Sequence, residues 1–116
     1  MWPVAVEAAR GALVGGGYDN SASGTNASVP GGYKNVAAGQ YSFAAGQQAQ
    51  ANHDGSFVWN DSTNAGDNTT FFASTAVNQF LIHATGGMGI NTNNPAGFAL
   101  NVNGTANFAG DRKSVV

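Results

Sequence analysis

The chain has 116 residues, a formal net charge of -2, and only 9% charged residues. This mildly acidic balance without a basic patch argues against a nucleic-acid partner. Hydrophobic content is 42%, but alanine is the commonest of these residues and buries little apolar surface. We therefore expect an ordered chain with a thin core that depends on stacking or on partner copies.

Residues 1–14 open the chain without a basic segment, and Glu7 and Arg10 interrupt their apolar stretch, which is poor for a signal peptide. We interpret them as an N-terminal cap or junction that forms either a short helix or a first strand. The apolar runs of the whole chain are too short for a transmembrane helix, so no direct membrane insertion is expected. Cysteine is absent, which excludes disulfides and thiolate metal sites.

Residues 15–61 carry an internal repeat in which a small polar residue and an alanine precede a glycine at fixed offsets. The copies end at Gly24, Gly39 and Gly46, and a degenerate copy ends at Gly31. Each unit suits one short strand and one tight turn, for which the glycines supply a positive φ. Two units form one coil of about 14 residues in a parallel solenoid whose alanines face a narrow interior. The preceding Asn or Ser bonds within the turn or stacks in ladders between coils.

The array loosens after Gln47, and a turn signal at residues 52–55 precedes the bulky run 57–59. We expect this run to cap the solenoid by covering its last coil. Residues 62–70 have the composition of a loop. Residues 79–84 form the strongest predicted strand, which residues 85–87 turn into a hairpin with residues 88–91. Asn103 and Gly104 predict a second hairpin between residues 100–102 and 105–108.

Residues 62–110 are accordingly predicted to form a β-rich neck, and residues 111–116 a frayed tail. One alanine-lined roll buries too little to offset a backbone ordering cost of about 1–2 kcal/mol per residue. We therefore expect three rolls to share an axis. The bulky residues of the predicted trimer core are Trp59, Phe71, Phe72, Phe80, Leu81 and Ile82.

Three tyrosines of the array, Tyr18, Tyr33 and Tyr41, are candidates for a ligand surface. Tyr18 and Tyr33 share their flanking pattern and are expected at equivalent places one coil apart. Aromatic rings with a polar edge suit stacking on sugars or gripping a matrix protein. The alternative is a structural ladder that packs coil on coil or subunit on subunit, and both interpretations stay open.

Histidines and acidic residues give little sign of catalysis or metal binding. His83 should share a strand face with Leu81, and His53 is not expected to face the adjacent Asp54. The loop carries four acidic and amide side chains, Asp61, Asn64, Asp67 and Asn68. Their spacing differs from that of the ligands in an EF-hand calcium-binding loop. No nucleophile elbow or Walker lysine is present. We predict a protein that is not an enzyme and that has no cofactor and no metal.

The Asn/Ser-x-Ala-x-Gly copies resemble the head repeats of trimeric autotransporter adhesins, the YadA-like left-handed parallel β-roll. Residues 78–95, followed by Ala-Leu-Asn-Val-Asn-Gly at residues 99–104, look like a segment of bacterial and phage tail-fibre-like proteins. Together the two resemblances cover about residues 15–110. They imply an all-β homotrimer: a short left-handed parallel β-roll followed by an intertwined β-hairpin neck. The Val-Ala-Ile-Gly type strand of adhesin heads is missing from this array, and no stalk, anchor or chaperone domain follows.

The expected function is that of a trimeric structural fibre or adhesin head segment. The resemblance implies an extracellular location on a bacterial surface or phage virion, where the segment mediates attachment to a host glycan or surface protein. The alternative is a carbohydrate- or receptor-binding module that uses a Tyr/Asn/Gln surface of the same scaffold.

Overall fold

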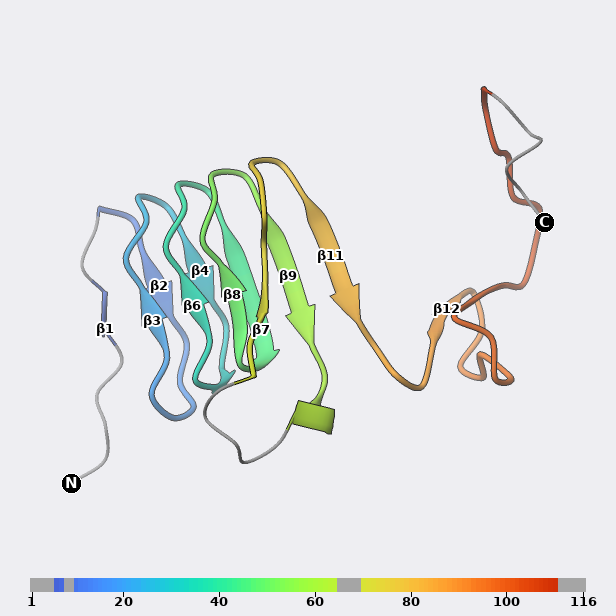
Figure 1. Cartoon of the computed structure of the whole chain (residues 1–116), viewed down its shortest axis with the longest axis horizontal. Helices are drawn as coiled ribbons and strands as arrows, with labels where there is room; N and C mark the ends of the chain where they lie inside the picture. The colour runs from blue at the N-terminus through green and yellow to red at the C-terminus, as the bar shows by residue number, and fades with distance from the viewer. Residues whose placement is uncertain (1–5, 8–9, 65–69, 111–116) are drawn as a thin grey trace. The chain divides into compact units, whose positions relative to one another are not determined.

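The computed structural model describes residues 6–7, 10–64 and 70–110. The chain divides into two compact units, residues 1–83 and 84–116. The described residues form an all-β fold of parallel strands stacked as a β-solenoid, and their single helical element is the 3-10 turn η1 (Ser62–Asn64) (Figure 1). Among them no helix has the length and apolar character needed to cross a membrane. The all-β solenoid prediction is confirmed.

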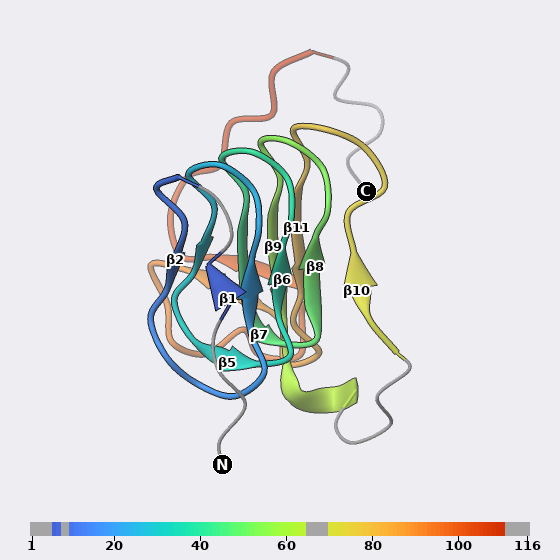
Figure 2. The same cartoon turned by 90° about the vertical axis from the view of Figure 1, so that its left-hand side faces the viewer.

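Two parallel sheets form the walls of the first unit, and the chain alternates between them (Figure 2). The first sheet, sheet A, has the order β1 (Val6–Glu7), β3 (Ser21–Ala22), β6 (Val36–Ala37), β8 (Ala49–Ala51) and β10 (Phe72–Ala73). Sheet B has the order β2 (Leu13–Val14), β4 (Ser28–Val29), β7 (Phe43–Gln47), β9 (Phe57–Asn60) and β11 (Phe80–His83), and β5 (Gly32–Tyr33) also pairs with β7. Register pairs such as Ser21 with Val36 and Val36 with Gln50 repeat every 15 or 14 residues. The predicted coil length is therefore confirmed.

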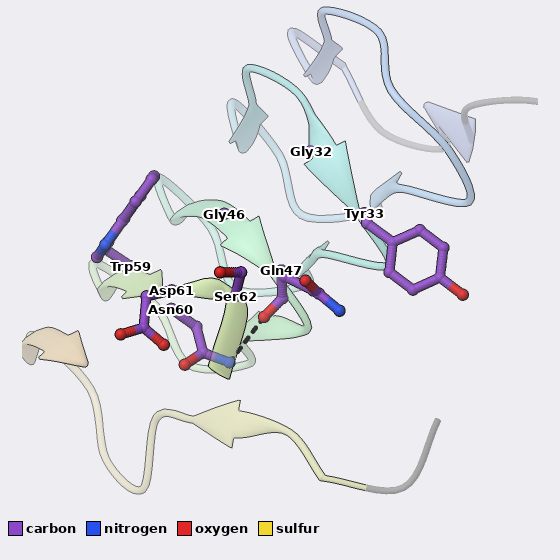
Figure 3. Close-up of a pocket in the computed structure, with 8 residues that line it drawn as sticks. All are labelled: Gly32, Tyr33, Gly46, Gln47, Trp59, Asn60, Asp61 and Ser62. Carbon is purple, nitrogen blue, oxygen red and sulfur yellow. Dashed lines mark hydrogen bonds between the residues drawn. The ribbon is translucent and has the colours of Figure 1, made fainter. Parts of the chain in front are cut away.

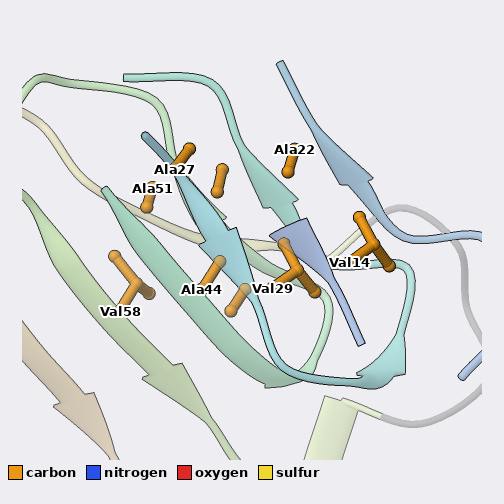
Figure 4. Close-up of a cluster of buried hydrophobic side chains, with 9 residues drawn as sticks. Val14, Ala22, Ala27, Val29, Ala44, Ala51 and Val58 are labelled. Atoms are coloured by element: carbon orange, nitrogen blue, oxygen red, sulfur yellow. The ribbon is translucent and has the colours of Figure 1, made fainter. Parts of the chain in front are cut away.

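Small side chains fill the space between the two sheets (Figure 4). Ala22, Ala37, Ala44 and Ala51 are each 0% exposed and pack in one cluster, with Val58 among the few larger members. Their alternation with outward-pointing neighbours follows the period of two of a β-strand. The prediction that alanines line a narrow interior is confirmed.

Asparagine side chains bridge neighbouring coils inside the solenoid. The Asn20 Nδ2 donates to the Gly32 carbonyl at 2.9 Å, and the Asn20 Oδ1 accepts from the Asn35 backbone N–H at 2.9 Å. The Asn35 Oδ1 in turn accepts from the Ala49 backbone N–H at 2.9 Å. These bonds satisfy backbone groups that the short strands leave unpaired. The predicted ladder of small polar residues between coils is confirmed.

Two of the predicted turn glycines, Gly24 and Gly39, have a different role from the one expected. Gly24 and Gly39 are buried and have no positive φ, whereas Gly46 has φ 97°. A Cβ at Gly24 would lie 2.0 Å from the Gly39 carbonyl oxygen, and a Cβ at Gly39 would lie 2.2 Å from the His53 carbonyl. These glycines are required because the backbones of adjacent coils pass so close together.

Left-handed backbone conformations recur at both corners, at Asp19, Lys34 and Gln48 on the return to sheet A and once per coil at the corner that leads from sheet A to sheet B. The positions at this latter corner are Gly11, Asn26, Tyr41, Gly55 and Asn78, with φ between 57° and 72°. The N–H groups of the last four donate to carbonyls one coil earlier, for example Tyr41 to Thr25 at 3.0 Å. Asparagine tolerates this conformation better than most residues, which explains two of the five identities.

The predicted cap at residues 57–59 and the predicted neck from residue 62 are wrong in position. Residues 57–60 form β9, on which β11 stacks in parallel with Phe80 opposite Phe57 and His83 opposite Asn60. Strand β10 likewise pairs in parallel with β8. The solenoid therefore continues to His83, and the register step in its last coil is longer than in the coils before it, as the pairing of Phe80 with Phe57 shows. The side chain of Phe57 points outward, so its bulk does not close the stack.

The predicted hairpins are also wrong. In the second unit, β12 (Met88–Ile90) pairs in parallel with β13 (Leu100–Val102), with Met88 opposite Leu100. No strand is assigned to residues 105–108, which lie within the described range. At the chain start the structure contains the short strand β1, which agrees with the first-strand alternative. The expected frayed tail at residues 111–116 lies outside the described residues.

Replacing Gly39 with alanine is expected to lower the free energy of unfolding by about 3 kcal/mol, because the backbone of the next coil cannot yield without losing its strand pairing. Gly86→Ala is the matched control, since a Cβ there meets nothing within 4 Å. Thermal unfolding followed by far-UV circular dichroism measures both. Equal midpoints for the two variants would contradict the close approach of the coils.

Gln48 is a buried polar residue without a partner. Its side chain is 0% exposed, and neither its Oε1 nor its Nε2 has a hydrogen-bond partner among the described residues. Such an amide costs about 1–3 kcal/mol. Gln48→Met, which keeps the length and removes the polar atoms, should therefore stabilise the chain by about 1 kcal/mol in chemical denaturation. The exposed Gln40→Met is the control, and destabilisation by Gln48→Met would show that the buried amide is satisfied in solution.

Candidate functional site

A row of stacked rings stands on the outer face of sheet B. Phe43 stacks on Phe57 with 4.6 Å between ring centroids, and Phe57 stacks on Phe80 at 4.4 Å. The strand register causes this arrangement, because it places Phe43, Phe57 and Phe80 opposite one another in successive coils. We refer to these three residues as the phenylalanine ladder. Its last member, Phe80, is 68% exposed.

The same face carries further apolar side chains. Trp59, which is 40% exposed, lies two residues after Phe57 and opposite Ile82 in the register. Leu13 is exposed in the first strand of the sheet. Together with the phenylalanine ladder they form what we call the apolar face of sheet B: Leu13, Phe43, Phe57, Trp59, Phe80 and Ile82. Ser28 lies between Leu13 and Phe43 in the register, so the continuous part of this face begins at Phe43. An exposed apolar surface of this kind typically marks an interaction site.

The structure divides the predicted trimer core. Trp59, Phe80 and Ile82 belong to the apolar face of sheet B, whereas Leu81 and Phe72 pack against the alanine-lined interior of their own chain. Phe71 is exposed and precedes β10. Phe43 and Phe57 belong to the face and were not predicted. Phe43 and Phe57 are separated by one coil length, and this spacing predicts equivalent positions on the same face of successive coils.

A groove of 380 Å³ lies at the end of the sheet B strands (Figure 3). Gly32 and Gly46 contribute no side chain to it, and its two aromatic residues are Tyr33 and Trp59, of which Tyr33 directs its ring away from Trp59 in Figure 3. The other lining residues are polar: Gln47, Asn60, Asp61 and Ser62. The groove therefore combines aromatic surface with an amide, a hydroxyl and a carboxylate, the mixture found in ligand sites.

Hydrogen bonds between coils hold one end of this groove. The buried Asn60 donates its Nδ2 to the Gln47 carbonyl at 2.7 Å (Figure 3). Its Oδ1 is therefore the acceptor for the His83 Nδ1 at 2.7 Å. The Asp61 Oδ1 lies 3.7 Å from the His83 Nδ1 and accepts from the backbone N–H and the hydroxyl of Thr63. These contacts fix the Asp61 carboxylate against the start of η1.

The structure agrees with the shared face of His83 and Leu81, but His83 packs within its own chain and is not the solvent-facing or inter-subunit residue that the sequence suggested. His83 faces the interior side together with Leu81, and its ring lies 5.3 Å from the Phe72 ring. His53 places its Nδ1 2.8 Å from the Ser74 Oγ, while Asp54 accepts from the Gln40 backbone N–H at 2.8 Å. His53 and Asp54 thus have separate partners, as expected.

The loop considered for calcium falls largely outside the described residues. Asp67, Asn68 and the side chain of Asn64 lie outside the described residues. Within the described part of the chain, no three His, Cys, Asp or Glu side chains gather closely enough to hold a metal ion.

The three tyrosines do not form a single stripe. Tyr18 and Tyr33 pair across neighbouring coils, and their rings stack with centroids 5.5 Å apart, which confirms their equivalence. Tyr41 lies at the corner between β6 and β7, where the chain passes from sheet A to sheet B, and is 66% exposed. Tyr18 and Tyr33 follow sheet B strands at the opposite corner. Only Tyr33 lines the groove.

The described residues define a parallel β-solenoid protein with an apolar sheet face and a groove that Tyr33 and Trp59 line. Comparisons of the chain with models of known protein families, with curated proteins and with solved structures find no match. The functional argument therefore depends on the geometry of the chain.

Tyr18→Ala is expected to lower the free energy of unfolding by about 1 kcal/mol, because it removes one ring of a stacked pair. Tyr41→Ala should change it by less than about 0.5 kcal/mol, since an exposed side chain without a packing partner contributes little. Urea denaturation of the two variants measures the difference. Equal losses would show that the Tyr18–Tyr33 stack does not join the coils.

Proposed function

We propose that this chain is a structural segment of a homotrimeric fibre or adhesin, displayed on a bacterial surface or phage virion, that mediates attachment. The observation that carries the proposal is the apolar face of sheet B. A rigid stack of coils suits a fibre because every coil repeats the same strand positions.

Energetics favour burial of this face in an assembly. Covering a large apolar side chain contributes about 1.5–3 kcal/mol, and the face includes several such side chains in contact with solvent. The interior provides little compensation, because most of its members are alanines. Association with further copies brings an identical apolar face to each chain, and closed rotational symmetry leaves no face uncovered.

The number of copies comes from the resemblance to trimeric adhesin heads and tail-fibre segments. Three faces of sheet B that meet around a common axis bury the phenylalanine ladder of each chain. The attachment role follows from the same resemblance, which implies a surface or virion fibre.

The mass of the intact chain tests this function. Size-exclusion chromatography with light scattering at micromolar concentration should give three times the mass of one chain. Phe80→Glu should reduce this to one chain, because a carboxylate buried in an apolar interface is strongly unfavourable. Phe80 is largely exposed in the single chain, so the variant is expected to keep its fold.

Val77→Glu is the matched control. It introduces the same charge at an apolar side chain that is 56% exposed but lies in the turn before β11, off the apolar face. This variant should keep the mass of three chains. A wild-type chain of monomeric mass would overturn the proposal, as would loss of assembly by Val77→Glu with assembly kept by Phe80→Glu.

A further inference from the structure

We propose that Asn103 is a self-modification site, at which the side-chain amide is converted to aspartate and isoaspartate. The Gly104 backbone nitrogen attacks the Asn103 Cγ, the side-chain nitrogen leaves as ammonia, and the amide proton of Gly104 passes through solvent to that ammonia. Water then opens the resulting succinimide ring at either of its two carbonyls. The only co-reactant is water, so the structure around these two residues sets the rate.

The sequence favours one place for this reaction. Asn103 and Gly104 are the only Asn-Gly pair in the chain. A glycine after the asparagine helps ring closure, because it has no Cβ to obstruct the approach to its nitrogen. At Asn94 the same ring cannot form, since the next residue is Pro95 and proline has no backbone N–H to lose.

The structure leaves both reacting groups of this pair unengaged. Asn103 is exposed and directly follows β13. Among the residues that the structure describes, none accepts a hydrogen bond from the Gly104 N–H, and none bonds to the side-chain amide of Asn103. A Cβ on Gly104 would meet nothing within 4 Å, so the space beside this residue is open. The Asn103 side chain can therefore turn toward the Gly104 nitrogen without breaking a native contact.

Asp54 and Gly55 show the opposite arrangement at a comparable pair. The Gly55 N–H donates to the Gln40 carbonyl at 2.8 Å, and the Asp54 Oδ1 accepts from the Gln40 backbone N–H at 2.8 Å. Ring closure there requires both hydrogen bonds to break, because the attacking nitrogen and the attacked side chain are each engaged. The solenoid corner thus protects such a pair, whereas the second unit leaves its own pair open.

The strand pairing of the second unit is compatible with the product. The Asn103 N–H donates to the Ile90 carbonyl at 2.9 Å, and the Asn103 main-chain carbonyl accepts from the Asn91 Nδ2 at 3.1 Å. In isoaspartate this N–H is unchanged, while the former main-chain carbonyl becomes a carboxylate, which accepts from Asn91 more strongly. The main chain then runs through Cβ and Cγ to Gly104. The extra methylene and the new negative charge therefore alter the chain only after β13.

The experiment compares two Asn-Gly pairs within one molecule. Asp54→Asn creates a second pair at the solenoid corner, where the new side-chain oxygen can still accept from Gln40. The full chain with this substitution is incubated at neutral pH, and peptide mapping by mass spectrometry with electron-transfer fragmentation measures aspartate and isoaspartate at each site. We expect Asn103 to convert at least about tenfold faster than position 54, a difference of about 1.4 kcal/mol in activation free energy.

Two controls separate the effect of structure from that of sequence. In concentrated urea the two sites of the same variant should convert at nearly equal rates, because unfolding removes the hydrogen bonds of the corner. Asn103→Gln keeps a side-chain amide but would need a six-membered ring, so its conversion should be undetectable over the same period. The parent chain supplies a test without the corner substitution, since its Asn103 should convert in the folded state nearly as fast as in urea.

Equal rates at the two sites of the folded variant would overturn the inference. An Asn103 that converts in urea but stays intact in the folded parent chain would overturn it as well, because the pair would then be protected. Conversion of Asn103→Gln at the rate of the parent would show that the amide is not lost through a succinimide.

Discussion

Successive coils of this solenoid are joined by main-chain hydrogen bonds between parallel strands, and the resulting spacing of about 4.8 Å constrains every other feature. Wherever the backbone of one coil passes directly over the next, a Cβ has no room, as at Gly24 over Gly39 and Gly32 over Gly46. The same constraint selects asparagine inside the corners. The amides of Asn20 and Asn35 reach the backbone groups that strands of only two residues leave unpaired.

Much of the solenoid could be predicted from sequence because its period is local. The recurrence of Ala22, Ala37 and Ala44 before glycines reports which positions face inward, and the coil length follows from it. The end of the stack could not be predicted in this way. Phe57 and Trp59 looked like a cap because they are large, yet strand alternation turns both outward and leaves Val58 inside.

Turn signals failed for a related physical reason. Asn103 with Gly104, or the glycines at 86 and 87, show where the chain bends but not whether the next strand pairs back on its predecessor or continues a parallel stack. The groove was equally hidden, because Tyr33, Gln47 and Trp59 come from three different coils. The strand register aligns Gly32 with Gly46 at the groove. This register depends on the change from a 15-residue to a 14-residue coil, which the sequence pattern does not show.

The apolar face and the groove both follow from the narrow interior. A phenylalanine in place of Ala44 would overpack the space between the sheets, so the large side chains stand on the outer face of sheet B. There they stabilise the chain substantially only when another surface covers them, which is the physical reason to propose association. Beyond Trp59 the strands end in glycine and polar residues, so this end of the face offers a partner copy little apolar area. One scaffold constraint therefore accounts for both the alanine-lined interior and the apolar outer face.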